Sequence, residues 1–81
     1  MNENEVKQVA LSVLASIAPE IADAALRSDQ PLRRQVDLDS MDWLNFLLGL
    51  HERLGVDIPE ADYARLTTLD EIANYLLAKL P

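Results

Sequence analysis

Apolar residues recur at helical spacing in the first part of the chain. They stand three and four positions apart and therefore fall on one face of a helix: Val6, Val9, Ala10, Val13, Leu14 and Ile17. Asn2 or Asn4 can cap the start of this helix, and Pro19 lies just beyond its end. The pattern predicts an amphipathic helix over about residues 4–17.

The next segment has no sustained period. Pro19, Pro31 and the turn sequence 28–31 interrupt it, and the run 21–27 has room for only a turn or two of helix. Apolar residues still recur through it: Ile21, Leu26, Leu32, Val36 and Leu38. Connections of this length are uncommon in compact domains unless they pack down or carry function. We therefore predict a long loop that these side chains hold against the core.

A second helix is predicted over residues 40–54, with Asp39 as N-cap and Gly55 at its end. One stripe of this helix faces inward: Phe46, Leu47, Leu50 and Leu54. A second stripe, offset by about a quarter turn or more, consists of Met41, Leu44 and Leu48. Because the core needs only one stripe, the second is a candidate contact surface.

The remaining third of the chain predicts two more helices. Pro59 suits the first position of a short helix over 59–65. Thr68 and Glu71 form a capping-box pattern for a last helix, whose apolar positions continue to the C-terminus: Leu69, Ile72, Ala73, Leu76, Leu77 and Leu80. No stretch alternates with period two. The chain therefore reads as one all-α domain over 1–81, with three longer helices, one short helix and a long loop between the first two longer helices.

Composition narrows the range of partners. The 81 residues carry 14 acidic and 7 basic side chains, a formal charge of -7, which disfavours nucleic acid and anionic membranes as partners. The chain lacks cysteine, which excludes a thiol nucleophile and a Cys-ligated zinc site. The polar N-terminus is unlike a signal peptide, and no apolar run approaches the roughly 18 residues of a membrane span. We expect a cytoplasmic monomer.

Ser40 is the main candidate for chemistry. It stands where the long loop meets the most apolar helix, and the free N–H groups at a helix N-terminus favour a negative group there. Serine is also a common N-cap, so a purely structural role is the alternative, although Asp39 can cap the helix one residue earlier.

Other candidate sites are weaker. His51 has no serine or cysteine within helical reach, so a surface role is favoured over a catalytic base, and no enzymatic activity is expected. Trp43 is more typical of half-buried filler than of an anchor for a partner. The run from Asp37 lacks the calcium-loop ligands at its fifth, sixth and twelfth positions, so no metal site is predicted.

Residues 38–77 resemble the acyl carrier protein family. Asp39-Ser40-Met41 is similar to the family's Asp-Ser-Leu signature at the start of its second helix. Ile58-Pro59-Glu60 resembles the segment before its third helix, and residues 66–69 (Leu-Thr-Thr-Leu) resemble the start of its last helix. Three matches in order, on an acidic helical chain of this length, indicate a four-helix bundle of the acyl-carrier type.

The resemblance implies that Ser40 receives 4′-phosphopantetheine from coenzyme A through a phosphopantetheinyl transferase (holo-acyl-carrier synthase) that recognises Asp39. The thiol of the arm would hold acyl intermediates as thioesters for fatty-acid, polyketide or related lipid biosynthesis, and acyl-loading and acyl-processing enzymes would dock on the second helix. The docking residues implied are Met41, Asp42, Leu44, Asn45, Leu48 and Glu52.

The chain departs from the family at several positions. Asn45 replaces an expected Glu, and His51 and Arg53 interrupt the acidic side of the helix, so we expect docking to depend more on the apolar stripe than on charge. Arg33 and Arg34 add positive charge before Ser40. These departures favour a specialised carrier. A peptidyl or aminoacyl carrier, or an unmodified helical module that docks through residues 40–54, stays open as an alternative.

Overall fold

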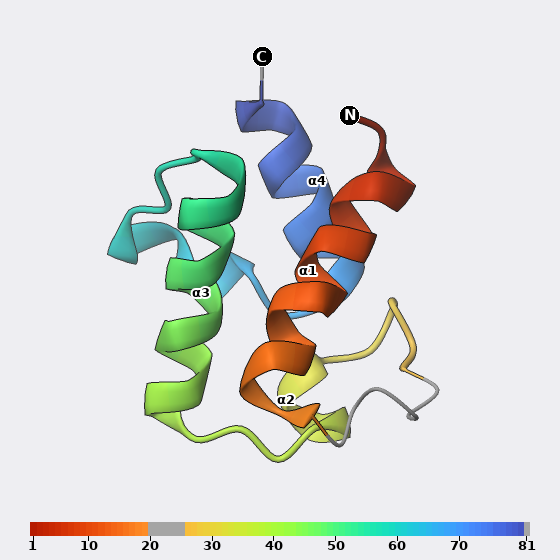
Figure 1. Ribbon diagram of the computed structural model, residues 1–81, viewed down its shortest axis with the longest axis vertical. Coiled ribbons are helices and arrows are strands. Elements are labelled where there is room, and N and C mark those ends of the chain that lie inside the picture. Colours follow the sequence, from red (N-terminus) through yellow and green to blue (C-terminus); the bar gives the residue numbers. More distant parts are fainter. Residues whose placement is uncertain (20–25, 81) are drawn as a thin grey trace.

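The computed structural model describes residues 1–19 and 26–80 (Figure 1). Its elements are α1 (Glu3–Ile17), α2 (Leu32–Gln35), α3 (Ser40–Leu54), the 3₁₀ helix η2 (Glu60–Arg65) and α4 (Leu69–Lys79). These residues include no strand, and their one isolated bridge joins Pro31 to Thr68. Within the same ranges, every helix is too short or too polar to cross a membrane. The all-α fold with three long helices is confirmed.

Local capping explains where α1 begins. Asn2 Oδ1 accepts a hydrogen bond from the Glu5 backbone N–H at 2.9 Å, and Asn2 N–H donates to Glu5 Oε1 at 3.1 Å. This capping box satisfies two backbone donors that a helix start otherwise leaves unpaired. The helix begins one residue earlier than predicted and ends at Ile17, as predicted.

The core is formed where α1 packs against both α3 and α4 (Figure 1). Each long helix contributes one fully buried face: Val6, Ala10, Val13 and Leu14 from α1; Phe46, Leu47 and Leu50 from α3; and Leu69, Ile72, Ala73 and Leu76 from α4. These faces form the centre of the stripes that the sequence predicts; the remaining predicted members are only partly buried: Val9, Ile17, Leu54, Leu77 and Leu80. Burial of these apolar side chains is the main source of stability in a bundle of this kind.

The segment between α1 and α3 differs from the prediction. Residues 32–35 form the short helix α2 rather than loop, and Leu32 N–H donates to Thr67 O at 3.0 Å. The Gln35 amide fastens the preceding turn, because its Nε2 donates to the Arg27 carbonyl at 2.8 Å and its Oε1 accepts from Arg27 N–H at 2.6 Å.

The predicted anchors of this segment are confirmed where the structure describes them. Leu32, Val36 and Leu38 are buried, and Leu26 packs partly against the core. Ile21 and most of the run 21–27 lie outside the described residues.

The two C-terminal elements follow their sequence signals with two corrections. The short helix is 3₁₀, and Pro59 precedes it as the N-cap rather than occupying its first position, so that Asp62 N–H donates to Pro59 O at 2.9 Å. In α4, Thr68 and Glu71 form the predicted capping box, with reciprocal bonds of 3.1 Å. The helix ends at Lys79, and Leu80 is extended instead of helical.

Candidate functional site

Ser40 is the first residue of α3, and its side chain is exposed. Asp39 caps the helix: its Oδ1 accepts from Asp42 N–H at 2.8 Å, while its carbonyl accepts from Trp43 N–H at 3.0 Å. The alternative in which Ser40 caps α3 is therefore wrong. Among the hydrogen bonds of the described residues, none involves the Ser40 hydroxyl.

The start of α3 is suited to an anionic group on Ser40. The free N–H groups of a helix N-terminus carry roughly half a positive charge, which favours a phosphate nearby. Asp39 satisfies the Asp42 N–H, and the first N–H groups of a helix have no partner within the helix itself. A phosphodiester attached to the Ser40 oxygen therefore fits this position.

The second stripe of α3 lies on the surface, as predicted. Met41 is 67% exposed, Leu48 47% and Leu44 39%, whereas the inward residue Phe46 is fully buried. Asn45 and Glu52 are exposed beside this stripe, and Asp42 is partly exposed. Together the stripe and these polar neighbours form one face of α3, which begins next to Ser40.

Arg33 and Trp43 meet beside the start of α3. Trp43 is half-buried, 5.2 Å from the Phe46 ring between centroids, as the prediction of a filler role requires. The Arg33 guanidinium lies 6.0 Å from the Trp43 ring centroid, and its Nη2 donates to the Leu38 carbonyl at 3.3 Å. Sequence reasoning missed this contact, since no local signal links residues ten positions apart.

Two cavities flank α3, and Tyr63 of η2 lines both. One of about 280 Å³ is lined by Leu47, Leu48, His51, Asp57, Ile58, Pro59 and Tyr63. The other, of about 170 Å³, is lined by Pro31, Arg33, Trp43, Tyr63, Ala64, Leu66 and Thr67. His51 is exposed, and its Nδ1 lies 2.9 Å from the Val56 carbonyl, which agrees with the predicted surface role.

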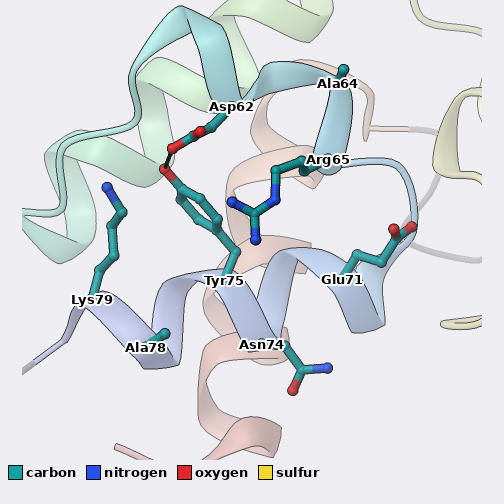
Figure 2. Close-up of a pocket in the computed structure, with 8 residues that line it drawn as sticks. All are labelled: Asp62, Ala64, Arg65, Glu71, Asn74, Tyr75, Ala78 and Lys79. Atoms are coloured by element: carbon teal, nitrogen blue, oxygen red, sulfur yellow. Dashed lines mark hydrogen bonds between the residues drawn. The ribbon is translucent and has the colours of Figure 1, made fainter.

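A cavity of about 660 Å³ lies between η2 and α4, and no residue of α3 lines it (Figure 2). The Tyr75 hydroxyl donates to Asp62 Oδ2 at 2.5 Å. Arg65 and Lys79 approach the Tyr75 ring, with charged groups 5.8 and 5.1 Å from its centroid. The contacts of Asp62 and Arg65 with Tyr75 join η2 to α4, whereas the Lys79 contact lies within α4. Burial together with the Asp62 hydrogen bond raises the pKa of Tyr75.

Comparisons with known proteins agree on one family. The family model described as "Phosphopantetheine attachment site" matches residues 8–76. The acyl carrier protein of Campylobacter fetus subsp. fetus is 27% identical over 73 residues, covering 90% of this chain and 88% of that protein. The acyl carrier protein of Thermosynechococcus vestitus is 25% identical, with 99% and 98% covered. The mitochondrial acyl carrier protein of Saccharomyces cerevisiae is 24% identical, with 94% and 63% covered.

Proposed function

The chain belongs to the acyl carrier protein family, and on that premise we propose that Ser40 is the residue that carries 4′-phosphopantetheine. Members of the family are carriers rather than enzymes, and phosphopantetheine is their covalent cofactor. The observation that supports Ser40 is its exposed hydroxyl at the start of α3, without a hydrogen bond among the described residues and with Asp39 as the cap.

The proposed attachment is a phosphoryl transfer from coenzyme A. The bond between Ser40 Oγ and phosphorus forms as the pyrophosphate bond of coenzyme A breaks, adenosine bisphosphate leaves, and the hydroxyl proton passes to the transferase. When bound, the arm supplies a thiol that holds acyl groups as thioesters. The chain's own contribution is to present the hydroxyl, to keep α3 intact through Asp39, and to offer a docking face.

We propose that partner enzymes dock on the exposed face of α3. Acyl carrier proteins in general interact with transferases and acyl-processing enzymes. In this chain the apolar stripe Met41, Leu44 and Leu48 would supply the buried centre of the contact. The polar neighbours Asp42, Asn45 and Glu52 would form its rim. On this proposal the 81 residues act as one monomeric carrier domain in the cytoplasm, serving fatty-acid, polyketide or related lipid synthesis.

Intact-mass measurement tests the attachment. The protein is incubated with coenzyme A, magnesium and a broad-specificity phosphopantetheinyl transferase. We expect a mass gain of one phosphopantetheine in the unaltered chain and in Ser12→Ala, which removes another exposed serine. Ser40→Ala should show none. No gain in any variant, or a gain that survives Ser40→Ala, overturns the proposal and leaves the unmodified docking module as the better reading.

A further inference from the structure

Arg33 is the basic side chain that the fold brings to the start of α3. Its guanidinium contacts one residue on each side of Ser40 in the chain: it donates to the carbonyl of Leu38, two residues before, and lies over the ring of Trp43, three residues after. Residues three apart on a helix are surface neighbours, with about 5–6 Å between Cβ atoms. Ser40 and Trp43 are therefore neighbouring positions on α3, and Arg33 reaches Trp43 from α2.

The charge around Ser40 makes this placement significant. Asp37, Asp39 and Asp42 bring three carboxylates into six residues of a chain that already carries a formal charge of -7. A phosphodiester on Ser40 would add a further negative charge among them. An arginine has five N–H donors in a planar fork that matches phosphate oxygens. Within the part of the chain that the structure describes, Arg33 uses one of these donors, in the 3.3 Å hydrogen bond to the Leu38 carbonyl.

We infer that Arg33 is a positioning residue for the prosthetic group, and that its guanidinium pairs with the phosphodiester on Ser40. This inference rests on the proposed function of Ser40. Around α3, at about 100° per residue, Trp43 lies roughly 60° to one side of Ser40, and the stripe of Met41, Leu44 and Leu48 lies roughly 40–100° to the other. Pairing with Arg33 therefore holds the first part of the arm on the Trp43 side and leaves the docking stripe uncovered.

Arg34 supplies a matched control. It has the same charge, is exposed, and follows Arg33 in α2, about 100° further around the helix. Its side chain takes part in no hydrogen bond, ion pair or aromatic contact within the described ranges, whereas Arg33 contacts the Leu38 carbonyl and the Trp43 ring. Replacing either arginine by glutamine removes one charge from the same short helix, so that only position distinguishes the two variants.

Phosphorus NMR of the phosphopantetheinylated protein tests the pairing. In Arg33→Gln we expect the phosphodiester resonance to move toward its position in the urea-unfolded holo protein, and in Arg34→Gln to stay where it is. Arg33→Lys keeps the charge without the fork and should give an intermediate shift. In the unaltered chain, the Arg33 side-chain N–H resonance should shift between apo and holo forms more than that of Arg34. Far-ultraviolet circular dichroism verifies that each variant is folded.

The outcomes separate this inference from the proposed function. If Ser40 gains no mass, both are overturned. If the mass gain is complete but Arg33→Gln leaves the phosphorus resonance in place, or Arg34→Gln moves it equally, Ser40 remains the attachment site and the role of Arg33 is overturned.

Discussion

At the scale of single residues, Asp39 combines a structural and a proposed recognition role. Its carboxylate caps α3 through the 2.8 Å bond from Asp42 N–H, and loss of an N-cap side chain costs about 1 kcal/mol. Asp39→Ala should therefore lower the free energy of unfolding by about that amount, measured by urea denaturation. Asp39→Asn retains a capping oxygen, so its free energy of unfolding should be close to that of the unaltered chain.

The same pair of variants isolates the carboxylate charge. If the transferase recognises that charge, Asp39→Asn is modified more slowly although its stability is kept, and the rate of mass gain measures the difference. Equal modification rates for Asp39→Asn and the unaltered chain would leave Asp39 with its capping role alone.

The raised pKa of Tyr75 predicts that stability depends on pH in the alkaline range. Burial and the hydrogen bond to Asp62 raise its pKa above the ordinary value of 10.0. Lys79 lowers the pKa, but by less than burial and Asp62 raise it. A group whose pKa is higher in the folded state holds its proton more tightly there, so its contribution to stability is complete below the unfolded pKa and is lost as pH rises through the folded one. The free energy of unfolding should therefore fall above about pH 10, and less steeply in Tyr75→Phe.

The chain has two tyrosines, so Tyr63→Phe leaves Tyr75 as the only phenol. Titrating its tyrosinate absorbance in the folded variant should give a midpoint above that found in concentrated urea. Coincident midpoints would contradict the raised pKa.

At the scale of elements, the contact of α1 with α3 depends on a glycine. A Cβ added at Gly49 would lie 2.5 Å from Cγ1 of the buried Val13, which is closer than van der Waals contact allows. Gly49→Ala gains about 1 kcal/mol of helix propensity, but overpacking of a core costs about 1–3 kcal/mol. We expect a net loss of stability by urea denaturation.

A double-mutant cycle checks the cause of that loss. Val13→Ala removes the opposing methyl groups, so the two substitutions together should destabilise less than the sum of their separate effects, with a coupling of about 0.5–3 kcal/mol. Additive effects would show that the methyl group added by Gly49→Ala does not press against Val13.

Elements with strong local signals could be predicted from the sequence, and elements held by distant contacts could not. Asp39 and Gly55 mark both ends of α3, and Thr68 with Glu71 marks the start of α4. In contrast, α2 has four residues and no side-chain cap, and one of its supports is the bond from Leu32 N–H to Thr67 O. Such a helix depends on tertiary packing, which a local pattern does not reveal.

At the scale of the whole molecule, the candidate site also has a part that the local sequence predicts and a part that depends on contacts between distant residues. Ser40, its cap and the apolar stripe are all on or beside one helix, so their relation follows from helical spacing. Folding brings Arg33 over Trp43, ten positions away, and places Tyr63 of η2 against the two cavities that flank α3. The sequence therefore predicted Ser40 as the candidate attachment point, but not the groups that surround it.

The distribution of charge over the molecule predicts how it docks. The net charge is -7, yet the exposed face of α3 carries only two acidic residues, Asp42 and Glu52, around an apolar centre, and the basic Arg53 of the same helix donates to Ser12 of α1. Leu48→Asp places a charge at that centre and should slow modification by the transferase roughly tenfold, equivalent to about 1.4 kcal/mol. Gln8→Asp adds the same charge to an exposed position of α1 and should leave the rate unchanged.

Because an apolar contact is insensitive to ionic screening, raising the salt concentration should change the rate of the unaltered chain little. A steep fall with salt, together with equal rates for the two variants, would instead assign docking to long-range charge.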